Sequence, residues 1–271
     1  MTDLLWSVAA FFNYLVLAYF LALNAVYLAT TVLAFVTLRR LSITLKALDT
    51  MEIIGATWAP PITLVAPAYN EEATCVESVR SLLTLEYPDV EVIVVNDGSK
   101  DATIERLTEA FNLYPTQRVP TGDIDTSEVR AIYRSRRQPN LWLIDKENGG
   151  KADALNVGIN YTQTPLFCAM DADSLIEPDA LSRITRPFLV DKSTVAVGGV
   201  LRIVNGCVVE DGRVTDVRLP SSFLARLQVI EYLRAFLSSR MGWGALNATL
   251  VISGAFGIFR REAVVNAGGY A

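Results

Sequence analysis

The sequence contains no histidine, and this absence excludes several kinds of active site at once. A Ser-His-Asp triad, a histidine-ligated zinc ion and a histidine general base are all ruled out. Cysteine is also scarce, with three widely spaced residues that lack metal-ligand spacing: Cys75, Cys168 and Cys207. We expect these to be reduced core residues of a cytosolic domain. Chemistry must therefore come from carboxylates, lysine, arginine, backbone dipoles and a metal ion.

An excess of positive charge is missing as well. The chain has 24 Lys and Arg against 29 Asp and Glu, which gives a formal net charge of −5, and no basic stripe is visible. Nucleic-acid binding normally requires a basic face that meets the phosphates. We therefore expect no nucleic-acid partner.

Charge is absent altogether over one long stretch near the N-terminus. No charged residue occurs between Asp3 and Arg39, and the apolar run of residues 4–38 exceeds the roughly 20 residues that cross a bilayer. A secretory signal would have a basic start, a shorter apolar core and a small-residue cleavage site, none of which fits. We predict a transmembrane segment over residues 1–40, with a buried helical hairpin as the alternative.

The charges that flank this segment predict its orientation. Arg39, Arg40 and Lys46 follow it, whereas Asp3 is the only side-chain charge before it. The positive-inside rule places the residues after the segment in the cytoplasm. We therefore expect a protein of the cell (inner) membrane whose remaining domain is cytoplasmic.

The rest of the chain divides into a juxtamembrane linker, residues 41–59, and a domain over residues 60–271. Residues 41–58 mix basic, apolar and polar types, which is compatible with a short helix at the membrane surface. Beyond them, β-branched runs of strand length alternate with stretches of helical spacing. We predict strands at 62–66, 90–95, 129–133, 141–144 and 165–170, helices at 75–83, 151–161 and 178–189, a further helix capped by Asp101 that ends near Phe111, and a loop over 113–128.

Alternating strands and helices of this kind indicate an α/β fold with a mostly parallel sheet and helices on both faces. In such sheets, ligands bind outside the carboxyl ends of the strands. Polar segments follow three of the predicted strands, at residues 69–72, 96–99 and 171–173. Simple turns explain each segment taken singly, but three segments on one rim make a shared site the better interpretation.

The last of these segments has two carboxylates spaced by one residue, Asp171 and Asp173. On an extended strand, side chains at i and i+2 point to the same face, so both carboxylates can bind the same ligand. Two carboxylates at a strand end favour a hard divalent cation, Mg²⁺ or Mn²⁺, with open positions for phosphate oxygens. A surface turn is the alternative, because Asp and Ser are common turn residues.

Four segments carry the most specific pattern in the chain. They are Val65-Ala66-Pro67-Ala68-Tyr69-Asn70-Glu71-Glu72, Val94-Val95-Asn96-Asp97-Gly98-Ser99, Asn148-Gly149-Gly150-Lys151-Ala152-Asp153-Ala154-Leu155-Asn156 and Asp171-Ala172-Asp173. In this order they resemble the motifs of family 2 glycosyltransferases, most closely the membrane-bound β-glycan synthases similar to cellulose, hyaluronan and poly-N-acetylglucosamine synthases. The likeness covers residues 60–271. It implies a GT-A fold, a nucleotide-sugar donor (most often a UDP-sugar), a glycan or lipid-linked acceptor and inversion at the anomeric carbon.

The resemblance also implies roles for individual residues. Asp97 would accept a hydrogen bond from the base, and Asp173 would ligate the metal directly. Gly98 permits a close backbone approach. Lys151, where a helix should begin, would neutralise phosphate together with the helix N-terminus, with a plain exposed lysine as the alternative. The full nucleotide-binding set that the resemblance implies is Pro67, Ala68, Tyr69, Glu71, Asp97, Gly98, Lys151 and Asp171, and the metal ligands are Asp171 and Asp173.

Two later segments have open alternatives. Residues 223–239 place Phe223, Leu227 and Ile230 on one face of a helix, which lies at the membrane interface or packs against the sheet; we favour the sheet. The segment Ser253-Gly254-Ala255-Phe256-Gly257 resembles the acceptor-side loop of the family, with a plain β-bulge as the alternative.

In the family, a Gly-Gly-Tyr similar to Gly268-Gly269-Tyr270 precedes an acidic segment that supplies the general base, followed by a Gln-x-x-Arg-Trp element and further membrane helices. The sequence stops at Ala271, before these elements, so no catalytic residue is assigned and we expect donor binding without polymer synthesis. We predict a metal-dependent, membrane-anchored glycosyltransferase. The alternatives are an inactive fragment or nucleotide-sugar-binding protein, and a lipid-phosphate sugar synthase.

Overall fold

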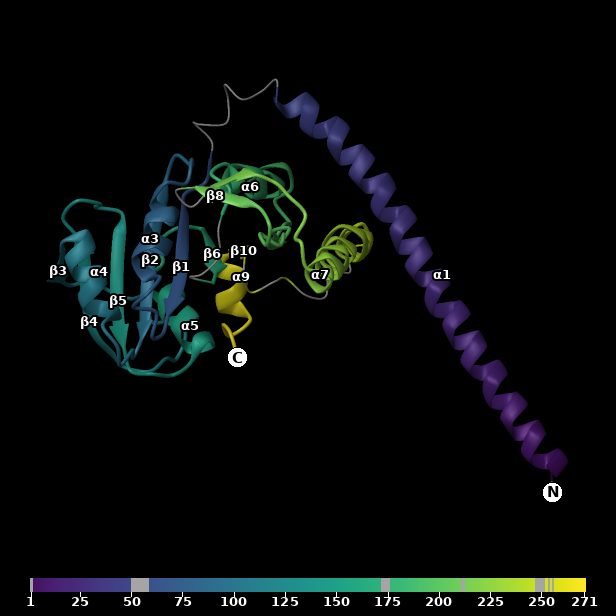
Figure 1. Cartoon of the computed structure of the whole chain (residues 1–271). Helices are drawn as coiled ribbons and strands as arrows, with labels where there is room; N and C mark the ends of the chain where they lie inside the picture. Colours follow the sequence, from purple (N-terminus) through teal and green to yellow (C-terminus); the bar gives the residue numbers. More distant parts are fainter. Residues whose placement is uncertain are drawn as a thin grey trace. The chain divides into compact units, whose positions relative to one another are not determined.

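The structure, a computed structural model, describes residues 2–49, 59–171, 176–210, 213–246, 252, 254 and 256–271. The chain divides into two compact units, and Figure 1 colours both along the sequence. We call them the helical unit, Met1–Glu52 with Pro220–Val251, and the sheet unit, Ile53–Leu219 with Ile252–Ala271.

The sheet unit is built on four adjacent parallel strands. β5 (Leu141–Lys146), β2 (Val90–Asp97), β1 (Ile62–Ala68) and β6 (Leu166–Met170) lie side by side in that order. The register pairs Ile62 of β1 with Val90 on one side and with Leu166 on the other. These strands are mostly apolar, as is typical of parallel sheets whose two faces are both covered by helices.

Antiparallel strands extend this centre on both sides. β4 (Val129–Ser135) pairs with β5 and β3 (Leu113–Thr116) pairs with β4, whereas β10 (Phe256–Arg260) pairs with β6 and β7 (Ala196–Gly198) pairs with β10. A separate hairpin consists of β8 (Val208–Glu210) and β9 (Arg213–Asp216). The predicted parallel sheet is thus confirmed at its centre, and the outer strands make the whole sheet mixed.

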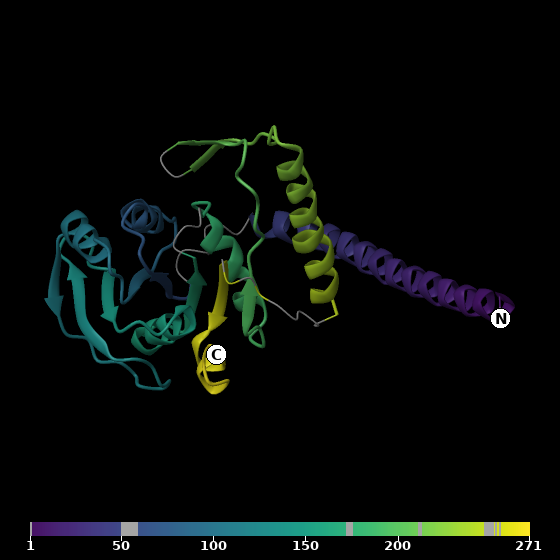
Figure 2. The same ribbon diagram turned by 60° about the horizontal axis from the view of Figure 1, so that its bottom comes forward.

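Helices cover both faces of the sheet (Figure 1, Figure 2). One hydrophobic core is formed with α3 (Cys75–Leu83), α4 (Thr103–Phe111) and α6 (Ala180–Val190), and the other with α5 (Lys151–Tyr161) and α9 (Arg261–Asn266). Every residue of α5 from Ala154 to Tyr161 is buried. Because close packing fixes this helix along its length, the position of its first residue, Lys151, is also fixed.

Three details of the sheet unit correct our expectations. Residues 113–128 are not all loop, because Leu113–Thr116 form the edge strand β3, where Pro115 is tolerated since one side of an edge strand is unpaired. α4 begins at Thr103, and Asp101 accepts a hydrogen bond from the Thr103 amide at 3.1 Å from just outside the cap position. Cys207 is partly exposed rather than buried.

The other two cysteines are core residues, as predicted. Burial raises the pKa of the Cys168 thiol to about 12, so this thiol stays protonated at neutral pH and is a poor nucleophile. No cysteine chemistry is therefore expected from the sheet core.

The helical unit begins with α1 (Thr2–Asp49), a single long helix. Among the described residues, its part Leu4–Arg40 is the one helix long and apolar enough, by length and composition, to cross a membrane. Large apolar side chains such as Trp6 and Phe11 are exposed along it. Residues 41–49 continue the same helix, so the separate short helix expected at 41–58 is not found there; residues 50–58 lie outside the described part of the chain.

The rest of the helical unit is α7 (Phe223–Leu233), the π-helical segment η1 (Arg234–Ser239) and α8 (Arg240–Gly244). A Cβ added to Gly242 would lie 2.5 Å from the Thr30 carbonyl oxygen, and the Arg234 guanidinium lies 5.6 Å from the ring centre of Tyr27. These contacts join η1 and α8 to α1. The expected packing of residues 223–239 against the sheet stays a prediction. Five large apolar side chains of α7 are exposed: Phe223, Leu224, Leu227, Ile230 and Leu233.

Candidate functional site

The carboxyl ends of the four parallel strands lie on one edge of the sheet, which we call the rim. The segments after β1, β2 and β6 begin at Tyr69, Gly98 and Asp171. This arrangement confirms that the three polar segments predicted from the sequence begin on one rim. A fourth strand, β5, also ends there at Lys146, which the sequence analysis did not single out.

Three residues predicted for different tasks meet on the accessible side of the rim. Lys151 Nζ forms an ion pair with Asp171 Oδ1, and the two side chains are 52% and 35% exposed. A Cβ added to Gly254 would lie 3.7 Å from Lys151 Nζ. One residue from each of the predicted phosphate, metal and acceptor groups therefore lies here. The remaining predicted residues of the last two groups lie outside the described part of the chain: Asp173, Ser253 and Ala255.

Lys151 is the first residue of α5, as predicted. The preceding Gly150 has φ +89°, a conformation that glycine adopts without a Cβ clash. The N-terminus of a helix carries a partial positive charge and unpaired amides. A lysine at this position adds a full positive charge, so the start of α5 favours an anion.

Asp97 is buried, and protein donors engage its whole carboxylate. Oδ1 accepts from Lys146 Nζ at 2.5 Å and from the Gly149 amide at 2.9 Å. Oδ2 accepts from the Gly150 amide at 2.8 Å and from the Asn148 side-chain amide at 3.2 Å. These donors match the roughly four lone-pair positions of a carboxylate. The predicted contact of Asp97 with a base would therefore require one protein donor to move aside.

Lys146 is fully buried and bridges two carboxylates. Its Nζ lies 2.5 Å from Asp97 Oδ1 and 2.6 Å from Asp153 Oδ2, and it donates to the Glu147 carbonyl at 2.5 Å. Asp153 also accepts from the Ser127 amide at 3.0 Å. Burial opposes ionisation of Asp153, but the hydrogen bonds from Lys146 and Ser127 outweigh it and lower the pKa of this carboxyl.

Gly98 permits a close approach of the protein's own backbone. Its predicted role at the nucleotide stays a prediction. Its φ is +67°, and a Cβ there would lie 2.8 Å from the Asn148 amide nitrogen. A side chain at this position would push the loop after β5 away from Asp97. Gly98 therefore shapes the rim through this loop.

Side chains tie the loops after β1 and β2 to each other. Ser99 Oγ accepts from the Asn70 amide at 3.0 Å. Asp101 accepts from the Glu72 amide at 3.0 Å, and Glu72 in turn accepts from the Ala102 amide at 3.1 Å. Several motif residues thus hold the two loops together as one structure.

The residues predicted to surround a base and ribose differ in exposure. Ala68 is buried, Pro67 is half-buried and Tyr69 is 47% exposed, so Tyr69 offers an accessible flat ring. Glu71 is half-buried, and its amide donates to Thr103 Oγ1 at 3.0 Å. The roles of these four residues stay predictions.

The Gly-Gly-Tyr segment is fixed on α5. The Asn156 side chain donates to the Tyr270 carbonyl at 2.9 Å and accepts from the Tyr270 amide at 2.8 Å. Gly269 has φ +84°, and a Cβ there would lie 2.6 Å from Asn156 Oδ1. The helix that begins at Lys151 therefore also positions the chain near its last residues.

Sequence reasoning missed the residues that build the buried side of the rim, above all Lys146 and Asp153. A charged residue at the end of an apolar strand was a visible signal for Lys146. Its partner was not visible, because the register that sets Lys146 beside Asp97 arises only when β5 and β2 pair.

One of the two predicted metal ligands, Asp171, lies on the accessible side of the rim. Asp171 supplies a hard oxygen ligand, and it already attracts a cation in the form of the Lys151 ammonium. Within the described ranges, no group of three or more His, Cys, Asp and Glu residues gathers to hold a metal. A metal at Asp171 would therefore take further ligands from Asp173 or from substrate oxygens.

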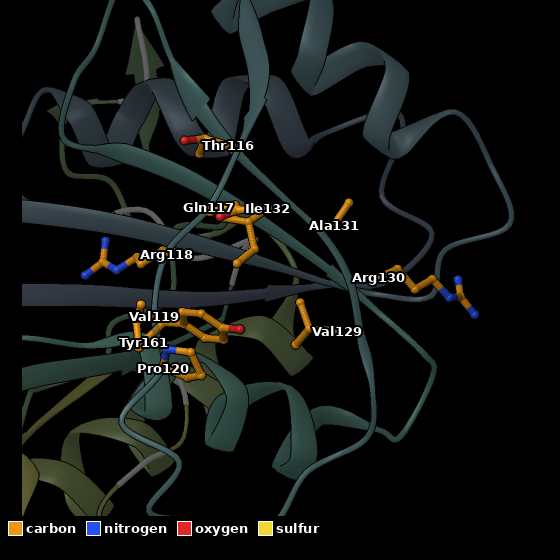
Figure 3. Close-up of a pocket in the computed structure, with 10 residues that line it drawn as sticks. All are labelled: Thr116, Gln117, Arg118, Val119, Pro120, Val129, Arg130, Ala131, Ile132 and Tyr161. Carbon is orange, nitrogen blue, oxygen red and sulfur yellow. The ribbon is translucent and has the colours of Figure 1, made fainter.

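A surface hollow of about 390 Å³ lies elsewhere in the sheet unit (Figure 3). It is lined by Thr116, Gln117, Arg118, Val119, Pro120, Val129, Arg130, Ala131, Ile132 and Tyr161. None of the predicted site residues lines it, and Figure 3 shows the side chains of Arg118 and Arg130 pointing in opposite directions. We therefore assign the candidate site to the rim.

The parallel centre with polar loops at its carboxyl ends defines an α/β domain of the kind that binds nucleotides at this edge. The model of the family described as Glycosyl transferase family 2 matches residues 63–265. This match covers most of the sequence, so the chain belongs to glycosyl transferase family 2. The resemblance seen in the motifs is thereby confirmed.

Similar curated proteins include the poly-beta-1,6-N-acetyl-D-glucosamine synthases of Staphylococcus epidermidis and of Staphylococcus aureus (strain COL). Each is 29% identical over 208 residues, which are 76% of this chain and 41% of the relative. The chain thus spans about two fifths of the length of these relatives. Among solved structures, the mannosyltransferase PcManGT from Pyrobaculum calidifontis, in complex with GDP-Man and Mn²⁺, has a TM-score of 0.54 at 19% identity and covers 88% of this chain and 59% of its own. The fold is GT-A-like, as predicted.

Proposed function

We propose that this chain is the membrane-anchored, donor-binding part of a glycosyltransferase that moves a sugar from a UDP-sugar to a glycan acceptor. The observation that carries the proposal is the meeting of Lys151, Asp171 and Gly254 on the accessible side of the rim. The similarity to poly-beta-1,6-N-acetyl-D-glucosamine synthases supports polysaccharide synthesis as the setting.

Donor binding would exchange the partner of Lys151. The Lys151 ammonium pairs with Asp171. A diphosphate carries more negative charge and also meets the amides at the start of α5, so it is the stronger partner for this lysine. The exchange would release the Asp171 carboxylate for other ligands. Tyr69 would pack against the base, and Gly254 would let an acceptor sugar approach the backbone.

Asp171, together with Asp173, would hold Mg²⁺ or Mn²⁺. When bound, such a cation offsets the negative charge that builds up on the leaving diphosphate. The mannosyltransferase with the similar fold was solved with Mn²⁺, which supports a divalent cation without choosing between the two metals.

Calorimetric titration with UDP tests the donor site. We expect binding with Mg²⁺ or Mn²⁺ and much weaker binding in EDTA. Asp173→Asn should remove most of the metal effect, because it deletes an anionic ligand with little change in shape. Asp89→Asn is the matched control, since Asp89 is exposed before β2, at the opposite end of that strand. Equal UDP affinity with metal and with EDTA would contradict the metal assignment.

The charges around α1 support a cytoplasmic sheet unit, on the side where nucleotide sugars are made. A reporter that is active only in the cytoplasm should work when fused after Ala271, and one that is active only outside should be silent. The opposite pattern would make a cytosolic donor unreachable and would refute this orientation.

Sugar transfer to a lipid phosphate is the second candidate and would use the same donor site. The names of the similar synthases favour a glycan acceptor. With a radiolabelled UDP-sugar, label recovered in a lipid extract rather than in polymer would favour the second candidate.

A further inference from the structure

We propose that Lys146 is a positioning residue for donor binding. Its ammonium holds Asp97, Asp97 holds the loop Asn148–Gly150, and that loop places Lys151 on the rim. This inference rests on the proposed function, because it assigns a role at the same site.

Lys146 has no exposed surface, so it acts only through its protein partners. Its ammonium lies between Asp97 and Asp153 at 2.5 Å and 2.6 Å. Two ionised carboxylates this close together would repel each other, and burial would penalise both. A buried cation between them removes both problems, provided that hydrogen bonds satisfy the remaining oxygens. The Gly149, Gly150 and Ser127 amides supply these hydrogen bonds.

The carboxylates in turn determine the shape of the loop after β5. The amides of two successive glycines, Gly149 and Gly150, donate to the two oxygens of Asp97. A Cβ added to Gly149 would lie 2.5 Å from Asp153 Oδ2 and 2.6 Å from Ser127 Oγ, so a side chain there would displace one or both of these groups. The loop therefore wraps around fixed negative charges, as backbone amides do around a bound anion.

The same loop leads directly into the donor-binding residue. Lys151 follows Gly150 and begins α5. Because the buried Asp97 carboxylate holds the loop through protein hydrogen bonds alone, Lys151 needs no donor to be placed on the rim. Such preorganisation lowers the entropy cost of binding. Loss of Lys146 should thus weaken recognition of the donor phosphates, although Lys146 touches no phosphate itself.

Hydrogen exchange of the unmodified protein is the first test. The amides of Gly149 and Gly150 should exchange slowly without nucleotide, because both donate to the buried Asp97 carboxylate. Exchange of both amides at the rate of an open loop would overturn the proposal.

Nucleotide affinity of variants is the second test, measured on the full chain in Mn²⁺. Lys146→Met should weaken UDP binding about tenfold or more, the effect typical when the supporting partner of a binding group is lost. The same substitution should reduce the affinity for uridine, measured by competition with UDP, much less, because uridine has no phosphate. Lys192→Met is the matched control, since Lys192 is exposed after α6 and its side chain takes no part in the rim.

Lys146→Met leaves the buried Asp97 and the half-buried Asp153 without their cation, so a second variant adds Asp153→Asn to remove one carboxylate. This pair of substitutions should restore the fold but not the UDP affinity or the slow exchange at Gly149 and Gly150. UDP affinity and exchange like those of the unmodified protein, or equal losses for UDP and uridine, would overturn the proposal. If neither variant folds, the hydrogen-exchange rates of the Gly149 and Gly150 amides in the unmodified protein decide whether the proposal holds.

If the unmodified protein does not bind UDP, the proposed function is wrong. The same exchange rates then still test whether the loop Asn148–Gly150 is held in place.

Discussion

The rim has a buried side and an accessible side, and the two treat charge in opposite ways. On the buried side, Lys146 bridges Asp97 and Asp153 within 2.6 Å, and backbone amides complete the network. On the accessible side, Lys151 and Asp171 are paired with each other and are about half and one-third exposed.

The two sides differ in how costly it is to separate their charges. In the interior, a charge that loses its partner keeps a large desolvation cost, so the buried network resists rearrangement. Near the surface, water screens the Lys151–Asp171 pair, and its two charges separate at little cost. The buried side therefore fixes the shape of the rim, and the accessible side is able to exchange partners with a substrate.

The largest expected effect concerns Asp97. Asp97→Ala leaves the Lys146 ammonium with one carboxylate and removes the acceptors of Gly149 and Gly150. We expect the free energy of unfolding of the sheet unit to fall by about 3–5 kcal/mol, as when a buried ion pair is broken. Pulse proteolysis of the full chain in urea and detergent measures this quantity. Asp89→Ala, at an exposed position, should change the free energy of unfolding by no more than about 0.5 kcal/mol. Equal effects of the two substitutions would contradict the view that the buried side of the rim fixes its shape.

The next effect concerns Gly98 and has a matched control. Gly98→Ala places a Cβ 2.8 Å from the Asn148 amide nitrogen, whereas Gly122→Ala meets nothing within 4 Å. The two glycines have φ +67° and φ +69°, so both substitutions carry the same backbone strain, about 1 kcal/mol. Only Gly98→Ala should lower the free energy of unfolding by a further amount of about 1–2 kcal/mol, because of the clash, and only this substitution should weaken UDP binding. Equal changes in unfolding free energy and UDP affinity for the two variants would show that the loop at Asn148 moves aside at little cost.

A smaller effect should appear as a pH dependence. The pKa of Asp153 is lowered in the folded protein, so the ionised carboxylate stabilises the fold at pH values above the ordinary value of 3.8. This contribution is lost as the pH falls through the lowered pKa of the folded state. The stability difference between the unmodified protein and Asp153→Asn should therefore be constant from about pH 5 to 7 and shrink below about pH 4. A difference that grows on acidification would contradict the assignment.

Much of the sheet unit could be predicted from the sequence, because its central strands are continuous apolar runs with polar ends. The first residue of α5 was also predictable, since the Gly149-Gly150 turn marks where the helix begins. The edge strand β3 was not, because Tyr114 and Pro115 become strand residues only by pairing with β4. The Lys146–Asp97 contact depends likewise on strand register.

Ligand-induced stabilisation of the sheet unit tests the central claim most directly. With Mn²⁺ and UDP at about a hundred times the dissociation constant, the free energy of unfolding of the unmodified protein should rise by about 2.7 kcal/mol. Lys151→Met should unfold within about 0.5 kcal/mol of the unmodified protein when no ligand is present, because its ion pair is exposed. It should gain far less from the same UDP concentration. An equal gain in both proteins, or no gain in the unmodified protein, would contradict the assignment of the accessible side of the rim to the donor.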